Sequence, residues 1–207
     1  MQELLPGVLH WTQKHPNHGM EVSSYLLVDE RVALNPLVPP EGLEALGDAT
    51  VEAVVLTGRH HLRGSAAFVE AFGATVLAPA PGLDDMEADG LDVQGYADGD
   101  VLPGGLVARG VGELSPDEFA VLSERVRAVA PCDGVMRVGD GELGVPPTEL
   151  LGEDPDDVQA RIVASWARLL DAWDFDHLLL PHGDPIVGDA EEQLRRFVEA
   201  GGTRLSF

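Results

Sequence analysis

A buried strand, a short polar loop and a helix follow one another between Val51 and Phe72, and this order constrains the fold more than any other feature. The run 51–57 is rich in β-branched and aliphatic residues, which favours a strand buried on both faces. Small and apolar residues then recur at helical spacing from Gly64 to Phe72. Open α/β sheets bind ligands in loops at the carboxyl ends of such strands, so residues 58–63 form a candidate site.

The candidate loop holds two adjacent histidines between two arginines, in the order Gly58-Arg59-His60-His61-Leu62-Arg63. Three later segments also place polar residues next to apolar runs. Glu113 lies in the sequence Val-Gly-Glu-Leu-Ser-Pro, Asp133 follows the apolar run 126–130, and His182 follows the strand-like run 176–180 in the sequence Pro-His-Gly.

Together these segments resemble the metallo-β-lactamase superfamily. Its first signature, His-x-His-x-Asp-His before a glycine, lies on a strand-to-helix loop after a Leu-Thr step, as Leu56-Thr57 and Gly64 do here. Laid over the loop, the signature keeps only its second histidine, His60. A glycine stands for the first histidine, Leu62 for the aspartate and Arg63 for the last histidine.

The later metal-ligand positions of that superfamily are a histidine, a metal-bridging aspartate and a final His-Gly. The resemblance places Glu113, Asp133 and His182 at these positions, in the same order along the chain. It implies a mixed α/β fold, a four-layer αβ/βα sandwich, which covers residues 1–207 as a single metallo-β-lactamase-like domain. That length is enough for one well-buried core.

Members of the superfamily hold two metal ions with five histidines and two carboxylates. The resemblance implies that this chain retains four ligands, His60, Glu113, Asp133 and His182, and therefore binds at most one ion. Two imidazoles and two carboxylates suit Zn²⁺, and the exchange of a histidine for Glu113 moves the preference toward Mn²⁺ or Fe²⁺. A pocket that holds no ion, in which these four residues bond only to one another, is the alternative.

Arg63 explains the loss of a second ion, because a guanidinium is always charged and cannot act as a ligand. At a separation of about 4 Å and an effective dielectric of about 20, one positive charge opposes another by about 4 kcal/mol. We expect Arg63 to pair with Asp133 instead. Arg63, Arg59 and His61 are the candidate substrate-binding residues, and a solvent-facing loop histidine is the alternative for His61.

Two functions remain open from the sequence. The first is a hydrolase-like protein with a degenerate metal-dependent site that acts on an ester, thioester or lactone bond of a small molecule. The second is a metal-free pseudoenzyme that binds a small ligand or a protein partner. The sequence contains no Gly-x-Ser-x-Gly nucleophile elbow, no phosphate-binding Gly-x-x-x-x-Gly-Lys loop and no Cys-x-x-Cys pair.

The composition limits partners and location. Acidic residues outnumber basic ones, 36 against 13, for a formal net charge of -23, and Lys14 is the single lysine. Such a surface repels nucleic acid and anionic membranes. An acidic, lysine-poor chain also fits a halophilic or high-GC source without functional meaning. The lone Cys132 and the start Met1–Gly7, which lacks a secretory pattern, predict a cytoplasmic protein.

Elsewhere the sequence predicts strands, a hairpin and helices. We expect strands at 22–28, 31–34, 106–111, 119–122, 126–130 and 176–180, a hairpin that joins 135–138 to 142–145, and helices at 42–47, 155–173 and 190–199. Asp154 is expected to cap the second of these helices. His15 and His18 lie in a turn that overhangs the site in the related fold, although a plain surface turn is the alternative.

Overall fold

Seven strands form the first sheet of the computed structural model, which describes residues 1–17, 19–88 and 90–206. Their order across the sheet follows the chain from β1 to β7. Neighbours from β1 to β4 pair antiparallel, and neighbours from β4 to β7 pair parallel. The strands are β1 (Gln2–Leu5), β2 (Val8–Lys14), β3 (Glu21–Leu27), β4 (Val32–Leu34), β5 (Ala53–Val55), β6 (Thr75–Pro79) and β7 (Val93–Tyr96).

Five strands form the second sheet, in the order β12-β11-β10-β9-β8. Only β10 and β11 pair parallel, and the other neighbours pair antiparallel. All five residues of β9 are buried, which fits a strand covered on both faces. The strands are β8 (Val107–Gly110), β9 (Phe119–Ser123), β10 (Ala128–Ala130), β11 (His177–Leu178) and β12 (Ile186–Val187).

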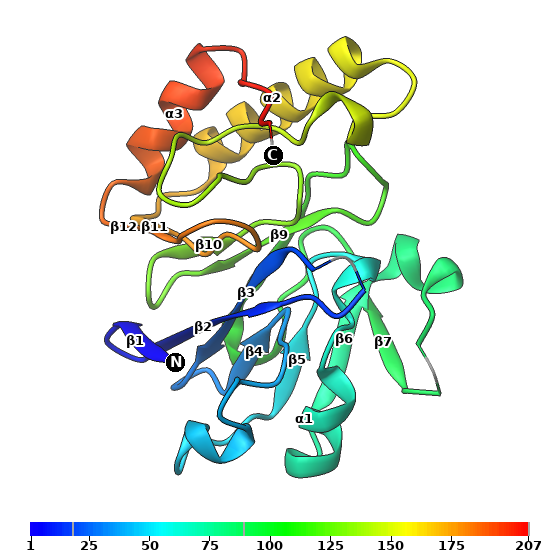
Figure 1. Ribbon diagram of the computed structural model, residues 1–207, viewed down its shortest axis with the longest axis vertical. Helices are drawn as coiled ribbons and strands as arrows, with labels where there is room; N and C mark the ends of the chain where they lie inside the picture. Colours follow the sequence, from blue (N-terminus) through cyan, green and yellow to red (C-terminus); the bar gives the residue numbers. More distant parts are fainter. Residues whose placement is uncertain (18, 89, 207) are drawn as a thin grey trace.

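Helices cover the outer faces of the two sheets. Helix α1 (Ser65–Phe72) lies against the first sheet, while α2 (Pro155–Ala172) and α3 (Ala190–Glu199) lie over the second (Figure 1). Helix, sheet, sheet and helix follow one another, so the four-layer αβ/βα sandwich expected from the sequence is confirmed. Short 3-10 helices in the connections are η1 (Leu43–Leu46), η2 (Arg59–His61), η3 (Ala80–Asp85), η4 (Pro103–Gly105) and η5 (Thr148–Leu150).

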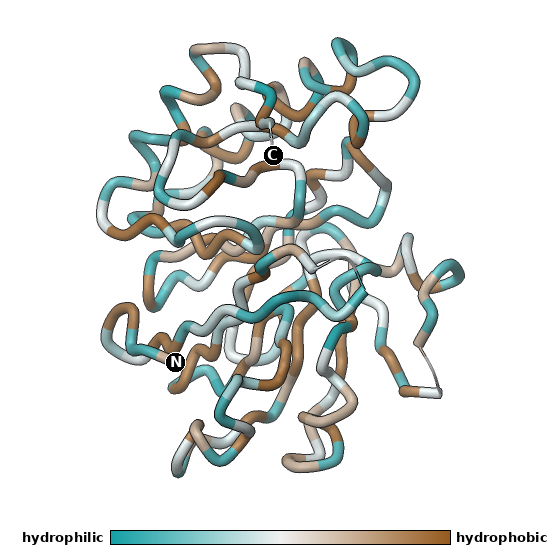
Figure 2. Tube along the Cα trace, in the orientation of Figure 1, coloured by the Kyte–Doolittle hydropathy of each residue, from teal (hydrophilic) through white to brown (hydrophobic). Residues whose placement is uncertain are grey.

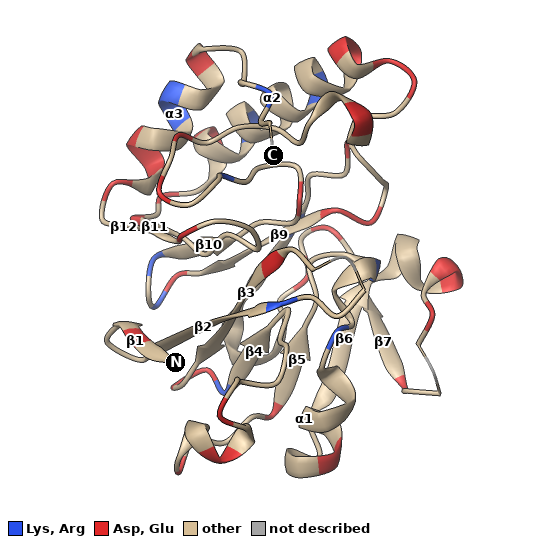
Figure 3. Cartoon of the chain, viewed as in Figure 1, with Lys and Arg blue, Asp and Glu red and all other residues tan. Residues whose placement is uncertain are grey.

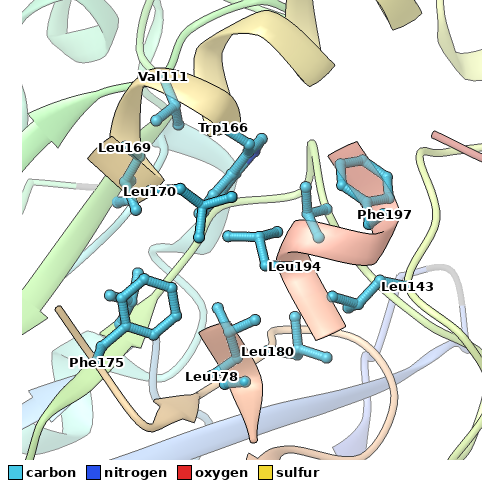
Figure 4. Packing of buried hydrophobic residues seen from close by; sticks show 14 of the residues in the cluster. Val111, Leu143, Trp166, Leu169, Leu170, Phe175, Leu178, Leu180, Leu194 and Phe197 are labelled. Atoms are coloured by element: carbon cyan, nitrogen blue, oxygen red, sulfur yellow. The ribbon is translucent and has the colours of Figure 1, made fainter. Parts of the chain in front are cut away.

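The apolar residues form three layers that match this architecture. Tyr25 and Phe119 belong to the layer between the two sheets, and Phe68 of α1 belongs to the layer outside the first sheet. Trp166 of α2 and Phe197 of α3 pack over the second sheet (Figure 4). Apolar residues are concentrated in the strands, and hydrophilic residues in loops and helix faces (Figure 2). Burial of these side chains is the main source of stability.

Helix α2 begins as its sequence predicts. The Asp154 carboxylate accepts a hydrogen bond from Asp157 N at 3.2 Å, and Pro155 occupies the first turn, where no backbone N–H is needed. Its apolar stripe, including Ile162 and Trp166, is buried against the second sheet. The stripe therefore belongs to the core.

The segment 135–145 differs from the predicted hairpin. Met136 and Gly144 form one isolated bridge in place of two paired strands. The buried Arg137 guanidinium holds the segment instead, since it donates to the carbonyls of Asp184 and Pro185 at 2.6 and 2.9 Å. A side chain thus replaces a backbone ladder there.

Two contacts between the sheets bring the loops after β5 and β11 toward the same region. Ser23 N donates to Pro181 O at 2.9 Å, and Phe119 N donates to Thr57 O at 2.9 Å. The Tyr25 hydroxyl adds a bond to Leu180 O at 2.7 Å. Acidic residues are spread over loops and helices of both halves (Figure 3). Among the described residues, no helix is both long and apolar enough to cross a membrane.

Candidate metal centre

The loop after β5 turns through η2, and this turn determines which of the two adjacent histidines faces the interior. His61 N donates to Gly58 O at 3.1 Å, which closes the turn. Successive residues of a 3-10 helix point about a third of a turn apart, so neighbours cannot both face inward. His61 is 2% exposed, whereas His60 is on the surface.

The side chains of His61, Asp133 and His182, from distant segments, converge at the Asp133 carboxylate. Nε2 of His61 lies 3.2 Å and 3.3 Å from the two carboxylate oxygens of Asp133, which follows β10. Nε2 of His182, from the loop after β11, lies 3.5 Å from Oδ1 of the same carboxylate. The Asp133 side chain keeps 32% of its surface exposed. The carboxylate is therefore held between two imidazoles and remains accessible.

The outer nitrogen of each imidazole is turned to a protein group. Nδ1 of His182 donates to Glu21 O at 3.3 Å, because a carbonyl can only accept. Nδ1 of His61 lies 3.1 Å from Oγ1 of Thr57. Such outer contacts orient imidazoles that bind metal ions in proteins.

Burial and neighbouring charges set the protonation of this cluster. Burial lowers the pKa of His61 to about 4, even though the Asp133 carboxylate acts in the opposite direction. Burial alone would raise the pKa of Asp133, but His61, His182 and Arg63 together hold it well below its usual value. At neutral pH the carboxyl is therefore ionised and the His61 imidazole is neutral, the forms that coordinate metals.

Arg63 brings a positive charge near this cluster and forms no ion pair among the described residues. The guanidinium NH1 group donates to Ser23 O at 3.2 Å and to Asn35 O at 3.0 Å. Its Nε is buried and has no hydrogen-bond partner among these residues. The expected pair with Asp133 is thus replaced by bonds to backbone carbonyls, although the charge still lowers the pKa of Asp133.

Sequence comparison gives no assignment: no model of a known protein family matches the chain, and no curated protein matches it. Structure comparison does. A metallo-β-lactamase from Pontibacter korlensis is similar over 96% of this chain and 97% of its own, with a TM-score of 0.66 and 18% identity. The chain has the metallo-β-lactamase fold.

Larger proteins contain the same fold. A flavodiiron protein from Giardia intestinalis is similar over 97% of this chain, with a TM-score of 0.69 and 16% identity. A rubredoxin:oxygen oxidoreductase from Desulfovibrio gigas is also similar over 97% of this chain, with a TM-score of 0.68 and 14% identity. The chain spans 58% and 61% of their lengths. Identities this low show a shared fold, and any chemistry has to be argued from the site residues.

The metallo-β-lactamase fold brings together two of the four expected metal ligands, Asp133 and His182. It does not bring His60 to them, because His60 is on the exposed side of η2, where its Nε2 accepts a bond from Arg59 Nε at 3.3 Å. His61, expected as a substrate-binding residue, takes the inward position instead. The 3-10 turn therefore places the second histidine of the pair, and not the first, against Asp133.

Glu113 also lies away from this group. Its carboxylate pairs with two arginines of α2, Arg161 at 3.2 Å and Arg168 at 3.8 Å. The connection between β8 and β9 turns this side chain toward the helix, so Glu113 is not part of the cluster around Asp133. Asp117 and Glu118, the other acidic residues of that connection, line the cavity beside the cluster.

Arg59 is also engaged by the protein. Its backbone N–H donates to Asp117 Oδ2 at 2.7 Å, and its guanidinium pairs with Asp85 at 3.2 Å and with Asp117 at 3.4 Å. Two carboxylates therefore compensate the single charge of Arg59, which leaves it less suited to bind an anion than the sequence suggests.

A cavity of about 200 Å³ opens beside the cluster. Its lining includes Glu118, which is 3% exposed and accepts a bond from Leu114 N at 3.2 Å. Burial, together with the charge of Asp133, raises the pKa of Glu118 to about 8. Burial likewise raises the pKa of the Cys132 thiol well above its usual value. Both side chains therefore keep their protons at neutral pH.

Gly58 occupies the position of the signature's first histidine, and the space it would need is filled. A Cβ atom on Gly58 would lie 2.7 Å from Sγ of Cys132 and 3.8 Å from a carboxylate oxygen of Asp117. Cys132 also belongs, with His61 and Asp133, to a group whose ligand atoms lie within 4.8 Å of one another. The fold thus gathers side chains that could hold a metal ion around Asp133 and fills the space beside Gly58.

Two residues that sequence reasoning missed support His61. Thr57 and Asn35 are both buried, and they lie at the ends of the neighbouring strands β5 and β4. Asn35 has a positive φ of 48°, a conformation that asparagine tolerates better than most residues, and an asparagine at a strand end was the available signal. His15 accepts a bond from Asn17 N at 3.3 Å in an exposed turn, and His18 lies outside the described residues.

Proposed function

We propose that this chain is a hydrolase-like protein that binds at most one metal ion between His61, Asp133 and His182. The expected substrate is a small molecule with an ester, thioester or lactone bond. One observation carries the proposal: Nε2 of His182 faces Oδ1 of Asp133 at 3.5 Å, while the other ring nitrogen of His182 donates to a carbonyl.

If His182 is a neutral imidazole, its bond to Glu21 O puts the single N–H on Nδ1. The lone pair on its Nε2 then faces a carboxylate, and two acceptors at this distance repel unless a positive charge lies between them. A proton or a metal ion would meet this need. His61 adds a second imidazole at the same carboxylate, in a position where burial disfavours the imidazolium form. These residues therefore fit a metal ion.

Two imidazoles and one carboxylate define the class of ion. Catalytic zinc sites with three protein ligands use such a set, and iron(II) sites use two histidines and one carboxylate with open positions. Because Glu113 pairs with α2, the additional carboxylate that would favour Mn²⁺ is absent from this group of described residues. We therefore expect Zn²⁺ or Fe²⁺.

The cavity and its lining limit the substrate. An ion with an open position lowers the pKa of bound water toward about 7 and polarises a carbonyl group. The volume of about 200 Å³ lies below the 300–1,000 Å³ of typical ligand pockets, so only the reacting end of a substrate would fit inside. Asp133 and the two histidines would orient the attacking water, and the uncharged Glu118 and Cys132 would let an acyl group approach.

Arg63 supports a second candidate, a metal-free protein that binds a small ligand or a protein partner. Its buried charge already compensates part of the negative charge of Asp133, and its Nε has no partner among the described residues. A small anion would satisfy that nitrogen. In this candidate, the site would bind but not hydrolyse.

Metal titration of chelator-treated protein tests the two candidates. We expect one Zn²⁺ or Fe²⁺ per chain, and at least a 100-fold loss of affinity in His61→Ala, Asp133→Asn and His182→Ala. His60→Ala and Glu113→Gln are matched controls, because one is the adjacent exposed histidine and the other pairs with α2. Equal losses in the controls, or no binding by the wild type, would rule out this metal centre.

Hydrolysis is tested separately with the metal-loaded protein and a panel of small esters, thioesters and lactones. We expect turnover of at least one class and loss of turnover in His61→Ala. Stoichiometric metal without turnover on any class would contradict the hydrolase assignment while retaining the metal centre.

A further inference from the structure

Asn35 fixes the orientation of Thr57 at the end of β5. Oδ1 of Asn35 accepts the backbone N–H of Thr57 at 2.9 Å, and Nδ2 of Asn35 donates to Oγ1 of Thr57 at 2.9 Å. A backbone N–H can only donate, so the two ends of the amide cannot be exchanged. One lone pair of the Thr57 hydroxyl is therefore always occupied by Asn35.

The hydroxyl has one hydrogen left to give and two neighbours that can take it. Oγ1 of Thr57 lies 3.1 Å from Nδ1 of His61 and 3.3 Å from Pro131 O. The carbonyl can only accept, whereas the imidazole nitrogen can either accept or donate. Two complete bonding arrangements follow, one for each tautomer of the imidazole.

We propose that the Thr57 hydroxyl, held by Asn35, is a positioning group that lets His61 present either tautomer to Asp133. The hydroxyl hydrogen points to Nδ1 of His61 in the metal-free protein and to Pro131 O in the metal-bound protein. The metal-bound half of this inference rests on the proposed function, and the metal-free half does not.

Relative bond strengths select the arrangement in the metal-free protein. An N–H on Nε2 of His61 would donate to the Asp133 carboxylate at 3.2 Å, and a bond to a charged acceptor is roughly twice as strong as a neutral one. The competing bond, from the Thr57 hydroxyl to Pro131 O at 3.3 Å, is neutral and long. The Nε2–H tautomer is therefore preferred, with the hydroxyl donating to Nδ1.

With a metal ion at this site, Nε2 of His61 would have to offer its lone pair, and the arrangement would reverse. One proton leaves Nε2 for water and one is taken up from water at Nδ1, so the imidazole remains neutral. Nδ1–H then donates to Oγ1 of Thr57, and the hydroxyl turns to Pro131 O. Neither state leaves a buried polar group of Thr57 or His61 without a partner, which avoids the cost of an unmade bond.

Substitution of Thr57 should affect the two states unequally. Thr57→Val is close in shape but cannot accept the Nδ1–H that the metal-bound state requires. We expect Zn²⁺ affinity to fall by about 10- to 100-fold, the usual effect of losing such an outer contact. Thr57→Ser should restore it, and Thr75→Val at the start of β6 is a control for the same change at another strand.

The direct test is ¹⁵N NMR of the histidine ring nitrogens, in wild-type protein without metal and with Zn²⁺. We expect the His61 hydrogen on Nε2 without metal and on Nδ1 with Zn²⁺. In metal-free Thr57→Val, the Nδ1 signal should shift as its hydrogen bond is lost, and Thr57→Ser should return it. A His61 hydrogen on Nδ1 in the metal-free wild type would overturn the inference.

This inference and the proposed function fail in distinguishable ways. Zn²⁺ uptake with an unprotonated Nδ1 on His61 overturns the inference and leaves the metal centre in place. An absence of Zn²⁺ uptake removes the metal centre, and a Thr57-dependent Nδ1 signal in the metal-free protein then still supports the metal-free half. If the Zn²⁺ affinity of Thr57→Val is no lower than that of Thr75→Val, the metal-bound half of the inference is contradicted.

Discussion

The two sides of the site differ in what their side chains bind. The retained side consists of His61, Asp133 and His182. The filled side consists of Gly58, Asp117, Glu118 and Cys132, and it is named for the Cys132 sulfur, which occupies the space beside Gly58 at the edge of the cavity. On the retained side, two imidazole nitrogens converge on one accessible carboxylate. On the filled side, Asp117 accepts from Arg59 N and from the Ser115 hydroxyl, both at 2.7 Å, and Glu118 accepts from Leu114 N.

If the proposed metal centre forms, the difference would explain why a site of this fold holds one ion and not two. Side chains of the filled side bind backbone and one another, so they leave few lone pairs for a cation. Gly58 supplies no side chain, and Cys132 takes its space. The buried charge of Arg63 further opposes a second cation. The proposed ligands of the retained side nevertheless converge on the Asp133 carboxylate.

The largest expected effect comes from Glu118→Gln, which tests whether the filled side is uncharged. Burial raises the pKa of Glu118 from 4.5 to about 8, so this group's stabilising contribution is fully present below pH 4.5 and is lost as pH rises toward 8. The slope is at most about 1.4 kcal/mol per pH unit. In denaturant unfolding of the metal-free protein, the free energy of unfolding of the variant should rise relative to that of the wild type as pH increases across this range. Parallel curves would mean that the filled side is charged.

A second test introduces a histidine at Gly58, the position aligned with the signature's first histidine. Gly58→His should lower the free energy of unfolding by about 1–3 kcal/mol, because its Cβ would meet Cys132 Sγ at 2.7 Å. The double variant with Cys132→Ala should recover part of this loss. Thermal unfolding measures the effect, and metal analysis should still give no second ion. A stable Gly58→His protein with two ions would break the comparison.

Arg63→Met tests the positive charge that Arg63 brings near Asp133 on the retained side. Removing a positive charge near Asp133 should strengthen cation binding by roughly tenfold, which corresponds to about 1.4 kcal/mol. The measurement is Zn²⁺ affinity by competition with a chelator, with Arg59→Met as the control because two carboxylates already compensate Arg59. Weaker binding in Arg63→Met than in Arg59→Met would show that Arg63 supports the ion instead of opposing it.

The smallest effect is expected for His60→Ala. The side chain is exposed and bonded only to Arg59 among the contacts described for it, so the free energy of unfolding should change by less than about 0.5 kcal/mol. Zn²⁺ affinity should also stay within experimental error of the wild type. A marked loss of Zn²⁺ affinity would mean that His60 binds the ion, which would contradict its outward position in η2.

The sequence predicts the framework well where a local pattern is strong. The strand, loop and helix between Val51 and Phe72, the Asp154 cap of α2 and the limits of α3 are all local features, and the structure contains them. The sequence does not predict β2, because polar residues such as His10 are buried in it and obscure the alternation of apolar and polar residues. The resemblance points to Asp133 and His182, each of which follows an apolar run at a strand end, and the structure brings their side chains together.

The rest of the site depends on contacts that no local pattern records. Which of His60 and His61 faces inward depends on the phase of a short 3-10 turn, closed by one bond to Gly58 O. Glu113 is turned away by Arg161 and Arg168, which lie on a helix far along the chain. Such partners are known only once the fold brings them together.

The most direct test of the retained side is a crystal structure of the protein loaded with Zn²⁺, with the ion located by anomalous diffraction. We predict one ion bonded to Nε2 of His61, to the Asp133 carboxylate and to Nε2 of His182, at about 2.0–2.2 Å from each ligand atom. An ion bonded to His60 or Glu113, a second ion on the filled side, or an empty site at saturating Zn²⁺ would contradict this account.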